Sequence, residues 1–264
     1  MAAASAPALL LALVSLWEMV EVSREVVRAP TEADWRAMSR SLRARHQAQD
    51  LIVFAPGWID PLGRHHLGDL ISIDMAARMD AARYTTIWEV AVGDARAPET
   101  DGMSPVDSAG FGRLELRRYR QQPAALATDF AAALGGAQVT GRGRGRPRVS
   151  LEEVGFAPHR CVLVVPEPGQ TVRITFPAVQ LGRQLVGHVG LADVFTRRDV
   201  REPARLVVSV GGRAVADVTV GVEDGWVRFA APTTGGRADV EIAATAVGPR
   251  ARDRRVCFAA EARL

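Results

Sequence analysis

The stretch from Asp50 to Asp80 concentrates the side chains of this sequence that could do acid–base or metal chemistry. Within it, APGWIDPLGRHHLGD carries Asp60, Arg64, His65 and His66 directly after an apolar run. His66 or Asp60 could act as a general acid or base, since both side chains can exchange protons with a substrate. Adjacent histidines seldom bind one metal ion, because ligand pairs on a helix are spaced three or four residues apart. We therefore expect no metal site, and only weak catalytic candidates in Asp60 and His66.

A structural interpretation of the same loop is favoured. Pro56, Gly57 and Pro61 would shape a tight turn, Trp58 would cover the core, and Asp60 would pair with Arg64. The sequence contains no G-x-S-x-G motif, no dinucleotide-binding glycine pattern and no cysteine placed as a nucleophile. The chain is therefore interpreted as leaning away from catalysis, and no cofactor is expected.

Candidate ligand-binding residues lie in both halves of the sequence. In the second half, GRQLVGHVGLADVFTRRD is predicted to be a glycine-rich connection that presents His188 and Asp193, and Trp226 follows in EDGWVRF. An aromatic ring can stack on the apolar face of a sugar, although a core tryptophan of a sandwich is the favoured alternative. The candidate ligand-binding set is Trp58, Arg64, His65, His188, Asp193 and Trp226.

The elements that must position the first group follow an α-β-α-β pattern over residues 31–92. Thr31 and Asp34 are spaced as a capping box, which predicts a helix with Trp35, Met38 and Leu42 on one face. DLIVFAP and RYTTIWEVAV predict buried strands, and LGDLISIDMAARMD predicts a second helix between them. This order is typical of a parallel sheet, and FGRLELRRYRQQ is expected at its edge.

The segment GRGRGRPRVS at 141–150 interrupts this pattern. Alternating Gly and Arg cannot pack a core, so we expect a linker between domains. Arg-Gly segments also contact RNA, but this one lacks aromatic residues, and the formal net charge of the whole chain is only +3. No nucleic-acid partner is expected.

From about residue 151 the sequence has an all-β character. Seven or eight short runs of β-branched residues are separated by Gly, Pro, Asp or Arg, as in a sandwich or jelly roll. The predicted fold is therefore α+β overall. A small α/β domain at 31–140 is followed by the linker and a jelly-roll-like sandwich at 151–264.

Cys161 and Cys257 lie in the runs that open and close the predicted sandwich. The first and last strands of sandwiches often pair, so we predict a disulfide bond between them. It would close a loop of 96 positions (257 − 161), for which chain-entropy models give roughly 4–5 kcal/mol of stabilisation. A disulfide would place the domain outside the reducing cytoplasm.

Residues 1–22 are predicted to be an uncleaved membrane anchor, because no side chain from Ala2 to Trp17 is charged. A buried amphipathic helix is the alternative. Arg24 and Arg28 follow the apolar run and none precedes it, which opposes an extracytoplasmic body. A start upstream of Met1, or an origin in a longer membrane protein, would remove that conflict.

Two resemblances add expectations to this interpretation. QDLIVFAPGWIDPLGRHHLGD, RYTTIWEVAV and FGRLELRRY resemble the soluble part of bacterial glycosyltransferases that use lipid-linked sugars. The catalytic acids of that family lie on membrane loops absent from this sequence, so no catalytic residue is carried over. Residues 155–264 resemble galactose-binding-like sandwiches such as carbohydrate-binding modules, through LVGHVGLADV, ARLVVSVGGR and DGWVRF.

The expected function is a membrane-tethered protein of the cell envelope that binds a glycan or glycolipid without catalysis. One alternative is a transferase or hydrolase using the loop at 56–69. The other is a structural module for protein–protein contact.

Overall fold

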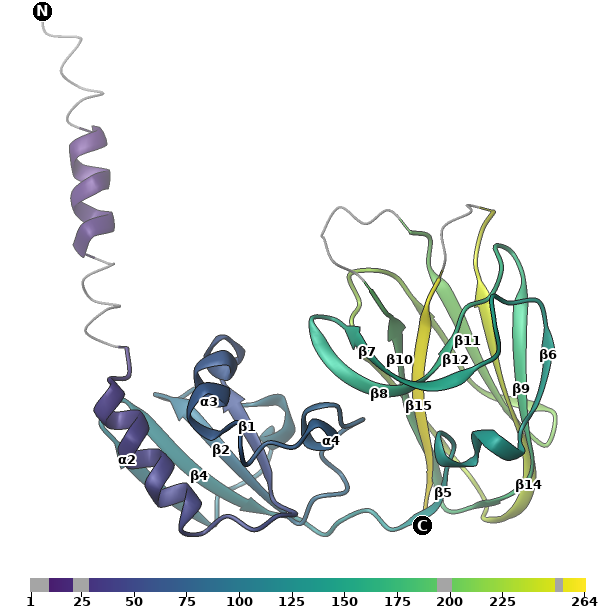
Figure 1. Cartoon of the computed structure of the whole chain (residues 1–264), viewed down its shortest axis with the longest axis horizontal. Coiled ribbons are helices and arrows are strands. Elements are labelled where there is room, and N and C mark those ends of the chain that lie inside the picture. The colour runs from purple at the N-terminus through teal and green to yellow at the C-terminus, as the bar shows by residue number, and fades with distance from the viewer. Residues whose placement is uncertain (1–9, 21–28, 194–200, 250–253) are drawn as a thin grey trace, which may run out of the picture. The chain divides into compact units, whose positions relative to one another are not determined.

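The computed structural model describes residues 10–20, 29–193, 201–249 and 254–264, and these form an α+β protein as predicted (Figure 1). The chain divides into two compact units, each described here by itself. Unit 1 contains residues up to Ile71 together with Thr85–Gln121. Unit 2 contains Ser72–Tyr84 together with Gln122–Leu264.

Unit 1 is built on a four-stranded sheet in the order β1-β2-β4-β3. Its strands are β1 (Leu51–Ala55), β2 (Thr86–Val92), β3 (Asp107–Phe111) and β4 (Leu114–Arg120). The predicted parallel pair is present, since β1 runs parallel to β2, but β4 pairs antiparallel with both β2 and β3 and makes the sheet mixed. The prediction that the LELRRYR run forms an edge was wrong. The true edge is β3, whose sequence DSAGF carries little apolar alternation and gave no strand signal.

The first helix of unit 1 forms as its sequence predicts. In α2 (Glu32–Arg43) the Thr31 hydroxyl accepts from Asp34 N at 3.2 Å, and Thr31 N donates to the Asp34 carboxylate at 2.9 Å. Trp35, Met38 and Leu42 are buried on one face. The amphipathic stripe therefore holds α2 in unit 1.

The second predicted helix does not exist as one element. The chain forms η1 (Gly57–Ile59) and α3 (Asp60–Leu67), stops, and restarts as the single turn α4 (Ile73–Ala76). Gly68 follows the end of α3, and the Ser72 hydroxyl accepts from Met75 N at 3.1 Å as a new N-cap. A helix end and a helix start therefore interrupt the apolar periodicity of residues 67–79.

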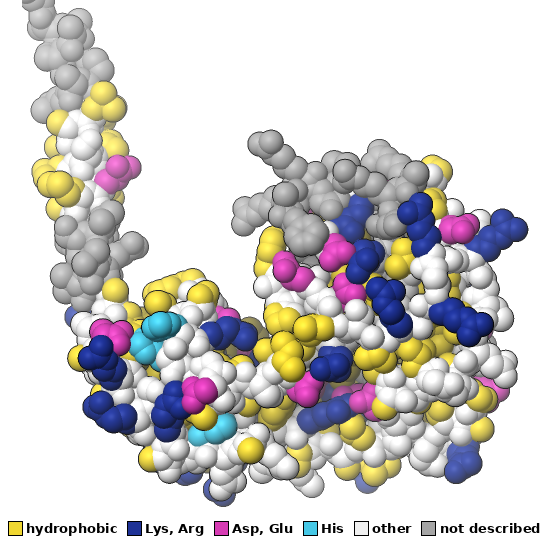
Figure 2. Space-filling view, in the orientation of Figure 1, with side chains coloured by type: hydrophobic (Ala, Val, Ile, Leu, Met, Phe, Trp, Pro, Cys, Tyr) yellow, Lys and Arg dark blue, Asp and Glu magenta, His cyan; other side chains and the backbone are white. Residues whose placement is uncertain are grey.

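One buried carboxylate in the unit 1 sheet accepts hydrogen bonds from several parts of the chain. Glu89 of β2 is fully buried and accepts from Ala97 N at 2.7 Å, Thr100 Oγ1 at 2.6 Å and Arg117 Nη1 at 3.0 Å. Burial opposes the charge of Glu89, but these donors outweigh it and lower its pKa. On the face of unit 1 that Figure 2 shows, acidic and basic side chains lie intermingled, as in ordinary solvated surface.

Unit 2 is a sandwich of two antiparallel sheets. The six-stranded sheet has the order β13-β10-β15-β8-β7, with β5 also paired to β15, and the five-stranded sheet has the order β12-β11-β14-β9-β6. The strands are β5 (Leu126–Asp129), β6 (Gln138–Gly141), β7 (Arg148–Val154), β8 (Ala157–Val164), β9 (Thr171–Leu181), β10 (Gln184–Leu191), β11 (Ala204–Val210), β12 (Arg213–Val220), β13 (Val227–Pro232), β14 (Gly236–Ala246) and β15 (Val256–Arg263). Alternate residues of each sheet, such as Ile174, Leu206 and Phe258, fill the core between them.

The predicted strands of the second half are present, but one expectation there was wrong. The run predicted as a glycine-rich connection contains β10, a strand paired on both sides within the six-stranded sheet. The predicted disulfide is confirmed, since Cys161 of β8 and Cys257 of β15 are bonded.

The units divide the chain elsewhere than at the predicted linker. Residues 122–140 belong to unit 2, because β5 pairs with β15 and β6 pairs with β9. Residues 72–84 belong to unit 2 as well. Residues 141–150 are part of the sandwich: Gly141 ends β6, Gly143 bridges Pro166, and Arg148 begins β7. Backbone pairing therefore holds this segment despite its composition.

The predicted anchor lies partly outside the described residues. Residues 10–20 form a helix, whereas residues 1–9 and 21–22 are not described. Within the described chain, no helix has both the length and the apolar character needed to span a bilayer.

Candidate functional site

The candidates of the first loop lie on η1 and α3 in unit 1. Trp58 is 62% exposed, so the prediction that it covers the core was wrong. The predicted local ion pair is present, with Arg64 Nε 2.6 Å from Asp60 Oδ2 one helical turn away. Asp60 and Arg64 therefore stabilise the first turns of α3.

The two histidines of α3 make packing contacts. His66 stacks on Trp35 of α2 with ring centroids 5.1 Å apart, and its Nε2 lies 3.5 Å from Glu32 Oε2. His65 meets the edge of His66 at 5.0 Å. Over the described parts of the chain, no three His, Cys, Asp or Glu side chains are grouped so as to hold a metal ion. These contacts give the histidines a structural role, because His66 packs α3 against α2.

Unit 2 offers a site with different geometry, on the outer face of its six-stranded sheet. The residues Ser72–Tyr84, here named the covering segment, are bonded to this face along its length. Arg160 N donates to Ala77 O at 2.9 Å, and Trp226 Nε1 donates to Met79 O at 3.1 Å. The Arg263 guanidinium donates to both oxygens of Asp80 at 2.8 and 2.9 Å. The covering segment buries outward-facing residues of β15 such as Ala259 and Glu261.

The site arises because two strands share one side of β15. β8 pairs with β15 only from Val256 to Phe258, and β5 takes over from Glu261 onward. At Arg160 the β8 backbone bonds to the covering segment, so Ala259 lies between the β8 pairing and the β5 side, where Phe130 N donates to Ala260 O at 3.1 Å. A pocket of about 620 Å³ opens there, named here the strap pocket. Its volume lies within the range of small-ligand sites, roughly 300–1,000 Å³.

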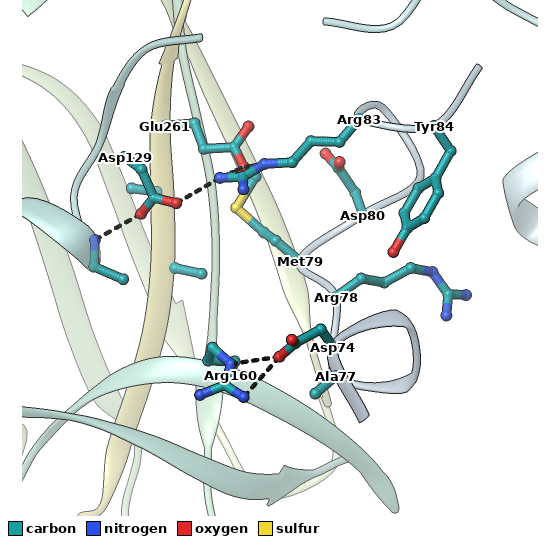
Figure 3. Close-up of a pocket in the computed structure, with 13 residues that line it drawn as sticks. Asp74, Ala77, Arg78, Met79, Asp80, Arg83, Tyr84, Asp129, Arg160 and Glu261 are labelled. Carbon is teal, nitrogen blue, oxygen red and sulfur yellow. Dashed lines mark hydrogen bonds and ion pairs between the residues drawn. The ribbon is translucent and has the colours of Figure 1, made fainter. Parts of the chain in front are cut away.

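Charged side chains line the strap pocket in fixed pairs (Figure 3). Arg160 donates twice to Asp74 Oδ1, at 2.7 and 3.0 Å. Arg83 lies 2.6 Å from both Asp129 and Glu261, and Arg263 Nε donates to the other Glu261 oxygen at 2.8 Å. Figure 3 shows Arg78 and Tyr84 on the side away from β15.

The surroundings of Arg83 and Tyr84 shift the pKa of both side chains upward. Burial disfavours the charge of Arg83, but its bonds to Asp129 and Glu261 outweigh this effect and raise its pKa. Burial raises the pKa of Tyr84, so its phenol stays protonated at neutral pH. The pocket therefore presents guanidinium and phenol donors beside carboxylate acceptors, over an apolar floor of Ala259 and Ala260.

Two predicted candidates, His188 and Trp226, lie together next to the covering segment. The Trp226 ring is stacked with His159 at 4.3 Å and with His188 at 5.7 Å. It also packs against the cluster of Val154, Ala192 and the disulfide. Burial lowers the pKa of both His159 and His188 to about 4. Trp226 thus holds the covering segment through its hydrogen bond to Met79 O, and it is not among the residues that line the strap pocket.

The remaining candidate, Asp193, lies apart from this stack. Its carboxylate is 2.5 Å from Arg255 Nε, and its backbone N donates to Glu153 O at 3.2 Å. The candidates predicted from sequence are therefore divided among η1, α3, the ring stack and the residues just after β10. None of them lines the strap pocket.

Sequence reasoning missed the residues that do line the pocket. Asp74 and Asp80 fall in the predicted second helix, Arg83 begins the predicted strand RYTTIWEVAV, and Arg160 and Glu261 fall in ordinary predicted strands. One signal was available: Glu261 and Arg263 both interrupt the apolar alternation of the last strand, which indicates a covered polar face.

Comparisons with known proteins give distant structural likenesses. No family model matches the chain, and no curated protein matches it. The carbohydrate-binding module 51 of a Clostridium perfringens GH95 protein, solved with methyl-galactose, has a TM-score of 0.33 and 9% identity, covering 51% of this chain and 98% of that one. The C-terminal carbohydrate-binding module 6 of a laminarinase from Zobellia galactanivorans has a TM-score of 0.27 and 11% identity, covering 47% and 99%.

A third structure contains a related module within a longer chain. It holds the second carbohydrate-binding module 51 and the INT domain of Clostridium perfringens ZmpB, with a TM-score of 0.31 and 10% identity. The match covers 48% of this chain and 29% of that one. These likenesses are too distant to transfer a ligand or a residue role, so the chemistry of the site is taken from this chain alone.

Proposed function

We propose that the protein is a carbohydrate-binding module whose strap pocket takes an uncharged sugar. One observation carries the proposal: the pocket sets donors and acceptors side by side above an apolar floor. A sugar ring has the complementary surface, with adjacent hydroxyl groups that both donate and accept at its edge and C–H groups on its face. Guanidinium and carboxylate groups form the strongest hydrogen bonds available to such hydroxyls.

The charge balance of the pocket supports an uncharged ligand. Four lining carboxylates, those of Asp74, Asp80, Asp129 and Glu261, face three lining guanidinium groups. Arg263 supplies the fourth cation by pairing with Asp80 and Glu261. An ionic ligand at Arg83 or Arg160 would have to compete with these pairs, whereas a neutral sugar can accept from the arginines and donate to the carboxylates without breaking them.

The same pairing supports binding in preference to hydrolysis. General acid catalysis by a carboxyl group needs a proton on it near neutral pH. Each lining carboxylate instead accepts a hydrogen bond from a guanidinium group. The assignment of a non-catalytic role rests on this arrangement.

The proposal includes a location in the cell envelope, with residues 1–22 as a tether. The disulfide supports it, because such bonds persist in oxidising compartments. Free-thiol titration of protein from its native host tests the location. The expected result is no reactive thiol before reduction, and two reactive thiols would contradict it.

Calorimetry with a panel of neutral mono- and disaccharides, chosen after a glycan array with the full chain, tests the pocket. Arg160→Gln should weaken binding at least about tenfold, since it removes a charged hydrogen-bond donor from the rim. Its melting temperature should stay unchanged, because the Arg160–Asp74 pair is largely exposed and such pairs stabilise little.

A matched control is available on the other sheet. Arg205 and Asp217 form an ion pair of similar exposure on β11 and β12. Arg205→Gln should leave sugar affinity unchanged. Equal affinity loss in the Arg160 and Arg205 variants, or no binding of any neutral glycan, would contradict the proposal.

A further inference from the structure

The segment from Gly141 to Arg148 has a fixed structure that neither the core nor the strap pocket explains. Its sequence, GRGRGRPR, leaves β6 and runs alongside residues 165–167. Arg144 N donates to Val165 O at 2.8 Å, and Glu167 N donates to Arg142 O at 3.2 Å. Backbone bonds therefore hold this highly charged run extended against the sandwich.

Close backbone approach explains why glycine and arginine alternate here. A Cβ atom on Gly141, whose φ is +97°, would come within 2.0 Å of Thr171 O. A Cβ atom on Gly143 would come within 2.7 Å of Val172 Cγ2 and 2.9 Å of Val165 O. Side chains are excluded at these odd positions and point to solvent at the even ones.

The result is a ridge of exposed cations. Arg142, Arg144, Arg146 and Arg148, here named the arginine ridge, are all exposed. Taking the described residues alone, Arg142, Arg146 and Arg148 form no ion pair with a carboxylate. An acidic residue, the exposed Glu167, lies next to the ridge, since its backbone N donates to Arg142 O.

A cavity of about 420 Å³ lies beside the ridge. Ala137, Val139 and Val172 form its aliphatic wall, and the side-chain-free backbone of Gly141, Gly143 and Gly145 leaves the space open. Arg146 completes the lining, which contains no acidic side chain. The groove thus combines an aliphatic surface with the Arg146 guanidinium group, and the other arginines of the ridge follow in the adjoining chain.

We propose that the arginine ridge and this groove bind an anionic polysaccharide. Its carboxylate or sulfate groups would accept from the guanidinium forks, which match such oxyanions in geometry, and the C–H face of a sugar would lie in the groove. The site is separate from the strap pocket, which is charge-balanced, and it goes beyond the function proposed for that pocket.

Two observations favour a polysaccharide over a nucleic acid. Residues 137–148 contain no aromatic side chain on which bases could stack. The disulfide also belongs to compartments where extracellular glycans are the common polyanions. A nucleic acid is therefore an outcome of the test and not the proposal.

The test measures affinity of the full chain for fluorescent polygalacturonate (carboxylate), dextran sulfate (sulfate) and neutral dextran of similar length. Arg142→Gln, Arg146→Gln and Arg148→Gln together should weaken binding to at least one anionic polymer about tenfold or more, and should flatten its salt dependence. Neutral dextran should not compete. Whichever anionic polymer binds identifies the oxyanion.

The control removes the same charge elsewhere on unit 2. Arg183, Arg213 and Arg237 are exposed and, among the described residues, form no ion pair, so their triple change to Gln has an equal effect on net charge. This control should lose less than about threefold in affinity, since dispersed exposed charges contribute little. Equal losses in both triple variants, or tighter binding of an oligothymidylate than of either polysaccharide, would overturn the proposal. Arg160→Gln should keep polyanion binding, so failure at the strap pocket and failure at the ridge are distinguishable.

Discussion

The covering segment is bonded to a stack of three rings, formed by His159, Trp226 and His188. His159 Nδ1 lies 3.3 Å from Arg78 O, and Trp226 donates to the next carbonyl, Met79 O. His188 is 93% buried, and its Nδ1 has no hydrogen-bond partner among the described residues. Burial favours the uncharged form of both imidazoles, and the nearby Asp80 carboxylate only partly offsets this effect at His188.

The stability of unit 2 should therefore fall on acidification. The pKa of each histidine is about 4 in the folded protein, against about 6.5 in the unfolded chain. A depressed histidine pKa means that the unfolded chain takes up protons first as the pH falls. The free energy of unfolding should be constant above about pH 7 and drop by about 1.4 kcal/mol per pH unit for each histidine between about 6.5 and 4.

Urea unfolding followed by tryptophan fluorescence from pH 7 to 4.5 measures this slope. His188→Asn should remove the contribution of one histidine, while the exposed His65→Asn should leave the slope unchanged. An unchanged slope in His188→Asn would show that this imidazole is not held uncharged.

Sequence reasoning at this scale found residues but not their partners. His188 and Trp226 were selected by type, and they do lie in contact. Their third partner, His159, lies on β8, and β15 separates β8 from β10 in the sheet. No local spacing encodes a contact between non-adjacent strands, so the stack could not be predicted.

At the scale of elements, β10 shows why a buried strand can look like a loop. Gly187 and Gly190 gave the run LVGHVGL the composition of a connection. In the sheet, a Cβ atom on Gly187 would come within 2.3 Å of the Phe229 ring and 2.7 Å of Ala259 O. Glycine is required there because the ring of Phe229 on β13 packs over the β10 backbone.

Gly187→Ala should destabilise the sandwich by about 1–3 kcal/mol, the usual cost of overpacking a well-filled core. Gly110→Ala on the edge strand β3 is the control, since a Cβ atom there meets nothing within 4 Å. Chemical denaturation of both variants measures the difference. A Gly187→Ala protein as stable as the Gly110→Ala protein would contradict the packing described for β10.

Strands with regular apolar alternation, such as β9, β11 and β14, were predictable because alternation alone places one face in the core. The short or polar strands β3, β5 and β6 were not. Only pairing with a neighbour defines them, as when Asp129 of β5 lies opposite Glu261. Asp129 of β5 lines the strap pocket, so the pocket could not be predicted from the sequence either.

At the scale of the whole chain, the division into units does not follow sequence order. The covering segment is encoded between α3 and β2 of unit 1, yet its hydrogen bonds go to β8, to β15 and to Trp226, the residue directly before β13, in unit 2. A helix-like pattern over residues 67–79 placed it with its sequence neighbours. The cysteine pair, by contrast, was predictable, because each cysteine lies in a recognisable strand, although β5, β6 and β7 precede the Cys161 strand β8 in unit 2.

This division predicts which segments lose stability together when the disulfide is removed. The bond closes a loop of 96 residues in unit 2, and its loss should cost roughly 4–5 kcal/mol. In hydrogen exchange of the Cys161→Ala/Cys257→Ala protein, amides of 122–264 that exchange by global unfolding should lose roughly a thousandfold in protection. Protected amides of the covering segment should lose protection with them, whereas residues 32–55 and 85–121 should be unchanged. Wild-type protein under reductant controls for the packing effect of alanine. Covering-segment amides that keep their protection while the sandwich loses it would show that residues 72–84 are held by something other than the strands that bound the strap pocket.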